Sequence, residues 1–436
     1  MIDIDLIRTD TDSVAANLAK RGIDRTTIDE LAALDQSWRT LTEETEALRA
    51  RQNQANEKIA AAPDSERQPL IYDMKQVAAS LKTKEADLKN VAEQRDAAWR
   101  QLPNLVADDV PEGPDESGNQ VLREVGEKPA FDFDPKPHWE LGAALDIIDT
   151  ERASAVTGSR FSYLKNELAL LQFALIQLAL NTLTNQSKLG AIISEAGLSV
   201  APKPFSPIIP PVFIRPDVLD RMARLEPKED RYYLESDDLY LVGSAEHTLG
   251  PLHMDQTLSA EDLPIRYVGY STAFRREAGS HGKDVRGILR QHQFDKLEME
   301  SFTIPDQSID EQNFFTAIQE HLMQQLAIPY RVVQICTGDM GDPDARQVDI
   351  EAWLPSENQY RETHTADLMT DYQARRLNTK VKIGDGKVYV HMNDATVFAI
   401  GRTLIALIEN HQQSDGSVAI PKALHPYLPF TEINTK

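Results

Sequence analysis

The chain has 436 residues, 41% of them hydrophobic and 26% charged, values typical of a folded globular protein of two to four domains. Its net charge of −23 argues against a general polyanion-binding surface, although a local basic patch would survive this average. The single cysteine, Cys336, excludes an intramolecular disulfide and a cysteine zinc cluster and favours a reducing cytoplasm, so no zinc is expected. The longest apolar run, residues 168–180, is too short for a membrane span, and the N-terminal segment has acidic residues where a signal peptide has basic ones. We therefore expect a cytoplasmic protein that does not enter a membrane.

Residues 28–102 contain no glycine, and their apolar side chains recur at alternating steps of three and four residues, the spacing of helices that pack as a coiled coil. This pattern predicts two long helices, residues 31–59 and 70–102, with Pro63 and Pro69 between them. We expect a long antiparallel hairpin, in which each helix is on the order of 45–50 Å long at about 1.5 Å per residue.

The outer part of this hairpin leaves two interpretations open. Residues 49–84 carry seven basic and four acidic side chains, a net charge of +3 in a chain of −23. A basic tip on a long arm favours contact with a phosphate backbone. The alternative is a coiled coil that only joins two copies of the chain, with its charges solvated. The seam positions Thr45, Gln52, Lys84 and Arg95 weaken that alternative because they are polar.

After the hairpin the sequence becomes rich in proline, glycine, aspartate and asparagine, which is typical of a linker. We expect an N-terminal helical domain over residues 1–112, a linker over residues 113–130 and a globular domain over residues 131–436.

The globular part mixes helical and strand patterns. A nearly continuous apolar pattern predicts a buried helix over residues 159–183, and prolines in residues 205–214 predict an edge or interface strand. Further helices are expected at 310–328, 371–377 and 395–411, and strands at 232–243, 264–274, 297–304, 330–339, 346–354 and 387–394. The mixture predicts an α+β fold on a mainly antiparallel β-sheet flanked by helices. No glycine-rich phosphate loop of the Rossmann or P-loop kind follows a strand.

One segment, residues 273–302, carries the chemistry, and its pattern predicts a strand, a polar loop and a returning strand. Arg275 and Glu277 are two residues apart, so both would face one side of the sheet, and Arg290, Phe294 and Glu298 would share a face of the returning strand. Guanidinium groups bind phosphate, an aromatic ring stacks on a base, and a carboxylate accepts from an exocyclic amine. The set suits a purine nucleotide; the alternative is an ion-paired surface sheet.

The same segment resembles motif 2 of class II aminoacyl-tRNA synthetases, and FRREAGS with RGILRQHQFDKLEM is similar to the seryl-tRNA synthetase version. The resemblance extends along nearly the whole chain, through the helical arm, FSPIIPPVF, CTGDMG, WLPSENQYRETHT, DYQARRLNT and GRTLIALIENHQ. It implies a class II catalytic domain with a tRNA-binding coiled-coil arm, acting as a homodimeric serine–tRNA ligase. Such an enzyme forms seryl-adenylate from L-serine and ATP and transfers the seryl group to the 3′ end of tRNA-Ser, with tRNA-Sec as a further candidate.

The resemblance also implies an ATP site. Arg275 would bind the α-phosphate and the serine carboxylate, Arg290 the β- and γ-phosphates, and Arg402 the γ-phosphate or one face of the adenine, so that these three arginines are catalytic. Glu277 would meet the adenine amino group and Phe294 would stack on the ring. The full implied set is Arg275, Arg276, Glu277, Arg290, Gln291, Phe294, Glu362, Thr363, His364, Thr365 and Arg402. Within it, Glu362 and Thr365 would be the Mg²⁺ ligands, because oxygen ligands suit that ion.

For serine, the resemblance implies a site made by Ser244, Ala245, Glu246, Arg275, Glu298 and Thr396. Two positions differ from the family pattern. The motif 3 segment HMNDATVFAIGR places Asp394 where an asparagine is usual, and Asn393 fits only after a shift of one residue; Thr365 stands in place of a serine. A polar pocket of this kind would select serine over alanine through groups that alanine leaves unpaired.

Two other functions fit parts of the pattern. A related ligase that loads an amino acid onto a carrier protein lacks a full arm, and the intact hairpin disfavours it. An inactive homologue that only binds RNA has no need of a complete site. His281, in the polar loop, is either an exposed residue or a contact to the acceptor end of tRNA, and Cys336 is expected to be a buried apolar residue.

Overall fold

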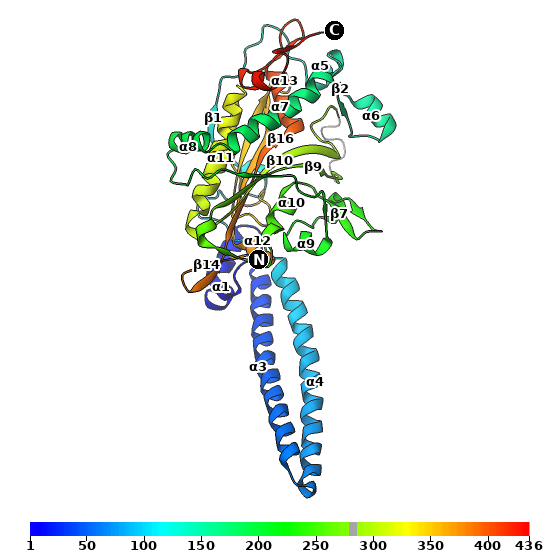
Figure 1. Ribbon diagram of the computed structural model, residues 1–436, viewed down its shortest axis with the longest axis vertical. Coiled ribbons are helices and arrows are strands. Elements are labelled where there is room, and N and C mark those ends of the chain that lie inside the picture. Colours follow the sequence, from blue (N-terminus) through cyan, green and yellow to red (C-terminus); the bar gives the residue numbers. More distant parts are fainter. Residues whose placement is uncertain (279–285, 436) are drawn as a thin grey trace. The chain divides into compact units, whose positions relative to one another are not determined.

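The computed structural model describes residues 1–278 and 286–435 (Figure 1), so His281 lies outside the described residues. The chain forms two compact units, residues 1–105 and 106–436. The functional boundaries expected at residues 112 and 130 remain a prediction. In the part of the chain that the structure describes, no single helix is long and apolar enough to cross a membrane. The helices α7 (Asn166–Leu183) and α8 (Gln186–Glu195) meet that test only as a pair bent by 79°.

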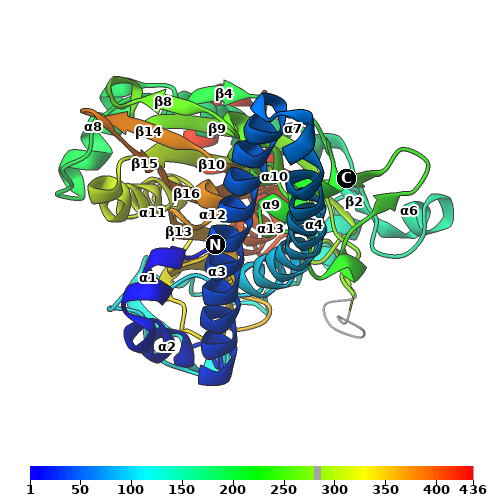
Figure 2. The same cartoon turned by 90° about the horizontal axis from the view of Figure 1, so that it is seen from below.

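The first unit consists of helices, and two of them form the predicted antiparallel hairpin (Figures 1 and 2). The helices are α1 (Ile4–Thr9), α2 (Thr11–Ala19), α3 (Arg25–Ala61) and α4 (Asp64–Arg100). Asp24 caps α3 by accepting from the Thr26 N–H at 3.4 Å. The helix α4 begins at Asp64, directly after Pro63, and Arg67 closes its first turn by donating to Asp64 and to the Ala62 carbonyl.

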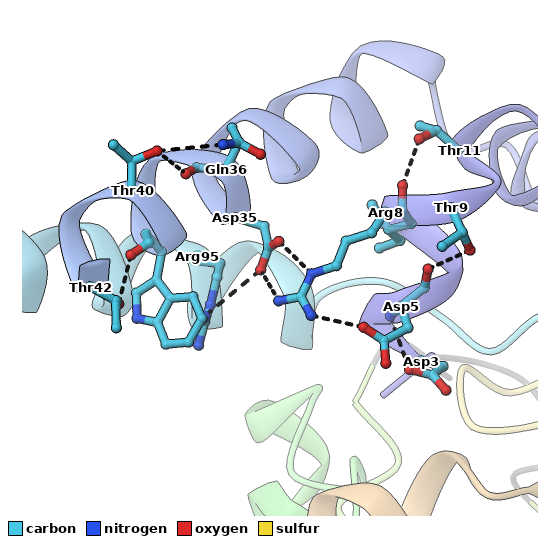
Figure 3. Close-up of polar contacts among 12 residues, drawn as sticks. Asp3, Asp5, Arg8, Thr9, Thr11, Asp35, Gln36, Thr40, Thr42 and Arg95 are labelled. Carbon is cyan, nitrogen blue, oxygen red and sulfur yellow. Dashed lines mark hydrogen bonds and ion pairs between the residues drawn. The ribbon is translucent and has the colours of Figure 1, made fainter. Parts of the chain in front are cut away.

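The base of the hairpin is held by a buried ion pair (Figure 3). Asp35 of α3 accepts from Arg8 of α1 at 2.7 and 2.8 Å and lies 3.8 Å from Arg95 of α4. The Arg95 guanidinium in turn stacks 4.0 Å over the ring of Trp38. One carboxylate therefore joins three helices.

The second unit is built on a large β-sheet of eight strands in the order β1-β11-β12-β13-β16-β10-β9-β4, and every pair except β4 with β9 is antiparallel. Its strands are β1 (Gln120–Val125), β4 (Ser206–Ile208), β9 (Ile265–Phe274), β10 (Gln293–Thr303), β11 (Tyr330–Gln334), β12 (Arg346–Leu354), β13 (Gln359–Thr370) and β16 (His391–Ala399). The α+β class, the antiparallel sheet and the edge position of the proline-rich strand β4 are confirmed. The edge strand β1 lies inside the segment expected to be a linker.

Smaller elements surround this sheet. The helices are α5 (His138–Ala144), α6 (Thr150–Val156), α7 (Asn166–Leu183), α8 (Gln186–Glu195), α9 (Pro216–Arg221), α10 (Glu246–Leu249), α11 (Ser308–Gln325), α12 (Tyr372–Leu377) and α13 (Ile400–Asn410). The short strands are β2 (Ile148–Asp149), β3 (Tyr163–Leu164), β5 (Phe213–Ile214), β6 (Tyr233–Leu234), β7 (Leu239–Leu241), β8 (Thr257–Ser259), β14 (Lys380–Ile383), β15 (Gly386–Tyr389), β17 (Val418–Ala419) and β18 (Glu432–Ile433). Helices α7, α11 and α13 share one hydrophobic core with the sheet (Figure 1).

Two predicted helices begin later than expected. The helix expected over 159–183 starts at Asn166, because β3 occupies part of the segment before it. The helix expected over 395–411 starts at Ile400, because residues 395–399 continue β16 as a central strand of the sheet. The second error concerns buried apolar residues, such as Val397 and Phe398, that suit a strand or a helix equally well.

Candidate active site

The large sheet has an apolar face and a polar face, because successive side chains of a strand point to opposite sides. On β10, Leu297 and Met299 belong to the hydrophobic core that the helices cover, as do Ala366 of β13 and Ala395 of β16. The alternate positions of these three neighbouring strands carry Lys296, Glu298, Glu300, Thr365, Asp367, Asp394 and Thr396. The site is built on this second face.

A cavity of about 860 Å³, including open space at its mouth, lies on the polar face. Eleven residues from the predicted ATP and serine sites line it: Glu246, Arg275, Glu277, Arg290, Gln291, Phe294, Glu362, Thr363, Thr365, Thr396 and Arg402. The seven other lining residues are Arg224, Ile288, Leu289, Lys296, Asp367, Ala399 and Gly401. Segments far apart in the sequence thus converge on one space of the size that binds small molecules.

The residues at one end of the cavity lie just outside the strands rather than on them. β9 ends at Phe274, so Arg275 and Glu277 follow it, and the chain turns at Glu277 with φ of +53°. Arg290 precedes β10 and does not continue its extended face as expected. Its guanidinium nevertheless meets the Glu277 carboxylate at 3.2 Å. The Arg275 guanidinium lies 5.3 Å from the centre of the Phe294 ring, so cationic and aromatic groups meet at this end.

A bulge brings two oxygen-bearing side chains to the same cavity wall. An extra residue, Thr363, shifts the pairing of β13 with β12, and such an insertion re-aims the side chains around it. Glu362 and Thr365 are three residues apart, yet both line the cavity. Arg402 donates to the Glu362 carboxylate at 2.9 Å, and the Thr365 and Thr396 hydroxyls lie 3.3 Å apart. Burial raises the pKa of Glu362, but the charges of Arg402, Arg275 and Lys296 together outweigh it and lower the pKa.

A second group of side chains at the cavity wall and behind it is acidic. The Ser244 hydroxyl donates to Glu298 at 2.6 Å, and Lys296 pairs with the same carboxylate. Glu246 forms an ion pair with Arg224 at 3.0 Å. Burial raises the pKa of Glu246, but Arg224, the strongest opposing charge, and its other cationic neighbours lower it to about 2. Glu246 is therefore an ionised carboxylate at the cavity wall at neutral pH.

Three further carboxyl groups lie side by side on the strands next to these residues. Asp394 of β16 is directly opposite Asp367 of β13 and Glu300 of β10 in the strand register. Like charges directly opposite one another destabilise a sheet. Burial, followed by the repulsion of neighbouring acids, raises the pKa of each of the three well above its usual range. Asn393, the alternative to Asp394, points elsewhere, because its amide donates to the Ser308 carbonyl at 3.1 Å.

Five of the predicted site residues do not line the cavity. Arg276 is exposed and lies over the ring of Tyr232 at 5.0 Å. Glu298 and Ser244 are buried against each other, Ala245 is buried, and His364 is buried with its ring 5.9 Å from that of Phe398. Among these five, Ser244 and Glu298 contact each other, and His364 Nδ1 lies 2.8 Å from the hydroxyl of Thr363, which lines the cavity. Burial lowers the pKa of His364 to about 3, so the imidazole is neutral at pH 7.

Some of the residues that the sequence did not single out had a usable signal. Lys296 has the same strand parity as Phe294 and Glu298, and Asp367 the same parity as Thr365, so alternation could have found both. Arg224 follows a short helix in a segment with no period or motif, and nothing in the local pattern indicates that it reaches the cavity.

Comparison with known proteins adds the family. Residues 1–106 match the seryl-tRNA synthetase N-terminal domain, and residues 231–411 match the tRNA synthetase class II core domain (G, H, P, S and T). The serine–tRNA ligase of Acidothermus cellulolyticus is 42% identical over 433 residues, 98% of each chain. The chain belongs to the seryl-tRNA synthetase family. It is an aminoacyl-tRNA synthetase by family and by class II core, as the resemblance implied.

Solved structures of the same family agree in fold. The seryl-tRNA synthetase of Pyrococcus horikoshii, complexed with ATP, has a TM-score of 0.90 and 36% identity and covers 100% of both chains. The cytoplasmic serine–tRNA ligase of Naegleria fowleri, complexed with AMP, has a TM-score of 0.85 and 28% identity and covers 100% of this chain and 99% of its own. The predicted combination of a coiled-coil arm and a class II catalytic fold is confirmed.

Proposed function

We propose that this chain activates L-serine with ATP and transfers the seryl group to tRNA-Ser. A serine carboxylate oxygen attacks the α-phosphorus, the bond from that phosphorus to the bridging oxygen breaks, and pyrophosphate leaves. A hydroxyl of the terminal ribose of tRNA then attacks the seryl carbonyl carbon, and AMP leaves. The observation that carries this proposal is one cavity lined by three arginines, Arg275, Arg290 and Arg402, and by an ionised carboxylate, Glu246.

The arginines act by position and charge. Arg275 holds the α-phosphate and the serine carboxylate, Arg290 the outer phosphates, and Arg402 the γ-phosphate or a face of the adenine. Each lines the cavity and is oriented by a neighbour: Arg275 by the Gly243 carbonyl at 3.1 Å, Arg290 by Glu277 and Arg402 by Glu362. Preplaced positive charge stabilises the charge that develops on the phosphate oxygens as the bond breaks.

Glu362 and Thr365 fit a Mg²⁺ ion that is shared with the phosphates. The bulge at Thr363 brings a carboxylate and a hydroxyl to the same wall, and Mg²⁺ is usually held by one or two carboxylates together with substrate oxygens. Within residues 1–278 and 286–435, no cluster of three or more His, Cys, Asp or Glu side chains is placed to hold a metal ion. The bound ion would neutralise phosphate charge during the attack.

The remaining partners follow from the family. The helical arm binds tRNA-Ser through its basic outer part, and two copies of the chain form a homodimer in the cytoplasm. Analytical ultracentrifugation tests the dimer directly: a sedimentation mass near 98 kDa, twice the 48.9 kDa of one chain, is expected, and a single-chain mass contradicts it.

Amino-acid-dependent exchange of pyrophosphate into ATP tests the chemistry. With serine, alanine, glycine, threonine and cysteine supplied in turn, exchange confined to serine is expected. R275A should abolish exchange, whereas R152A should not, because Arg152 is an exposed arginine paired with Asp149. Exchange with glycine or alanine would favour a carrier-protein ligase, and no exchange with any amino acid would favour an RNA-binding scaffold. Aminoacylation of tRNA-Ser and tRNA-Sec transcripts identifies the acceptor.

A further inference from the structure

Arg224 reaches the cavity from a backbone turn that few side chains would favour. It follows α9, and the residue before it, Ala223, has φ of +55°, a left-handed conformation that is unfavourable for alanine and is kept only where its surroundings enforce it. Two hydrogen bonds fix the turn: the Arg224 N–H donates to the Leu219 carbonyl at 3.1 Å, and the Arg231 side chain donates to the Arg224 carbonyl at 3.1 Å. The strained turn thus directs one particular side chain toward the cavity.

The guanidinium of Arg224 stands between the cavity and the buried acids beneath it. Its side chain is 16% exposed and lines the cavity wall. It lies 3.0 Å from Glu246 on the cavity side, and 3.4 Å from Asp394 and 3.9 Å from Asp344 on the protein side. Both of those aspartate side chains are 2% exposed. The guanidinium is therefore fixed from behind while one edge holds Glu246.

The carboxyl groups around Arg224 do not share one protonation state. Asp367, Asp394 and Glu300 favour the neutral form because burial and mutual repulsion raise their pKa values. Glu246 is as deeply placed, but its direct contact with Arg224 keeps it ionised. An amino-acid ammonium group needs an ionised, correctly oriented carboxylate. Among these four carboxyl groups, Glu246 alone is ionised and lines the cavity, which Thr396 also lines.

We propose that Arg224 is a positioning residue of the amino-acid site: held from behind by Asp394 and Asp344, it fixes the Glu246 carboxylate in the orientation that receives the ammonium group of serine. This inference rests on the proposed function and assigns a role to a residue that neither the motifs nor the family resemblance pointed to. The rival role for Arg224 is purely structural, as the hydrogen-bond donor, at 3.4 Å, that lets the Asp394 carboxyl group be buried.

Steady-state pyrophosphate exchange with the full chain separates the two roles. R224M should raise the KM for serine roughly 10- to 100-fold, the size expected when Glu246 loses the ion pair that orients it, and leave the KM for ATP unchanged. R224K should lie between R224M and the unmodified chain, because it keeps the charge but not the two-sided geometry. The control is R221M. Arg221 is the last residue of α9, pairs with Asp255 at 3.0 Å and does not line the cavity. Its replacement should therefore lower Tm alone.

The double variant R224M/D394N decides between the roles, because it replaces the buried carboxyl group that R224M leaves without its hydrogen-bond donor. If Arg224 positions Glu246, Tm recovers and the KM for serine stays high. If the double variant restores both quantities, or if R224M raises the KM values for ATP and serine equally, the inference is overturned. An unmodified chain without serine-dependent exchange overturns the proposed function and the inference with it, and that result is seen before any substitution is made.

Discussion

Glu300 illustrates how a single buried carboxyl group makes stability depend on pH. Its side chain is fully buried, and neither carboxyl oxygen has a hydrogen-bond partner among the described residues. Burial, followed by the charge of Asp394, raises its pKa well above the usual range. The folded protein therefore keeps a proton that the unfolded chain releases above about pH 4.5. The contribution of Glu300 to stability is complete below that pH and is lost as the pH rises toward the folded pKa.

We expect E300Q to stabilise the protein increasingly as the pH rises, by up to about 1.4 kcal/mol per pH unit, because glutamine stays neutral at every pH. Urea unfolding of both proteins at pH 5.5 and 7.5, followed by tryptophan fluorescence, measures the difference. E261Q is the matched control, since Glu261 is exposed and its replacement should have a small effect at both values. An equal effect of E300Q at the two pH values would contradict the expected protonation of Glu300.

At the scale of elements, a histidine on α5 holds the segment that leads into β10. The Ile288 N–H donates to His138 Nε2 at 3.2 Å, and His138 Nδ1 and the backbone N–H of His138 contact Glu409 of α13 at 3.0 and 2.9 Å. Gly287 has φ of +73°, and a Cβ atom there would lie 2.0 Å from His138 Nε2. The next residues, Ile288 to Arg290, line the cavity. The helix pair α5 and α13 thus sets the position of one wall of the cavity.

We expect G287A to raise the KM for ATP more than the KM for serine, because the added methyl group must displace the segment that carries Arg290. Pyrophosphate exchange at varied ATP and serine concentrations measures both constants. G22A controls for backbone strain: Gly22 has nearly the same φ, +75°, with no atom within 4 Å of the added Cβ. It should cost about 1 kcal/mol of stability at most and leave both KM values unchanged. Equal changes in G287A and G22A would show that backbone strain alone explains the effect.

The base of the arm depends in the same way on one carboxylate. The Asp35 side chain is 3% exposed and compensates both Arg8 and Arg95. We expect D35N to destabilise the chain by about 2–3 kcal/mol, because Arg8 and Arg95 lose the buried carboxylate that they share and keep only the more exposed Asp5 and Asp96 as partners. E85Q, which breaks the exposed Arg49–Glu85 pair across the same hairpin, should cost about 1 kcal/mol or less. Urea unfolding monitored by circular dichroism at 222 nm compares the two, and similar decreases in stability would argue against the buried ion pair as the main contact.

At the scale of the whole molecule, charge and function are distributed unequally. The chain has a net charge of −23 while residues 49–84 carry +3. The proposed tRNA contact therefore depends on a few exposed basic side chains of the arm, among them Arg51, Lys58, Lys75 and Lys82.

We expect the combined variant R51Q/K58Q/K75Q/K82Q to bind tRNA-Ser more weakly, and with a log Kd that changes less steeply with log salt, by nearly one unit of slope for each phosphate that no longer meets a basic side chain. Serine-dependent pyrophosphate exchange should be unchanged, since no tRNA takes part in it. Filter binding at several salt concentrations gives the slope, and K89Q, nearer the base of the arm and exposed, is the control. A slope equal to that of the unmodified chain would remove the arm from the proposed contact.

Sequence pattern predicted most of what is local in this fold. The heptad spacing found α3 and α4, and turn-separated apolar runs indicated the antiparallel sheet. It failed where apolar residues suit two structures, as at residues 395–399, and where a single extra residue changes the geometry, as at Thr363. Arg224 lay beyond its reach because the contacts of that residue join segments 22 to 170 positions apart in the chain. A larger share of the residues predicted for ATP than of those predicted for serine therefore lines the cavity.

The 37 residues of each arm helix give the hairpin a length of about 55 Å at about 1.5 Å per residue. A hairpin of that length acts as a lever that turns about the contact of Arg8, Asp35 and Arg95 near its base. Asp35 lies 26 residues before the end of α3, about 39 Å from the tip, so a tilt of about 5° at that contact carries the tip through about 3.5 Å. The angle between α1, α3 and α4 is thus held by three side chains, and a small loosening of their contacts would be magnified into a larger displacement of the tip.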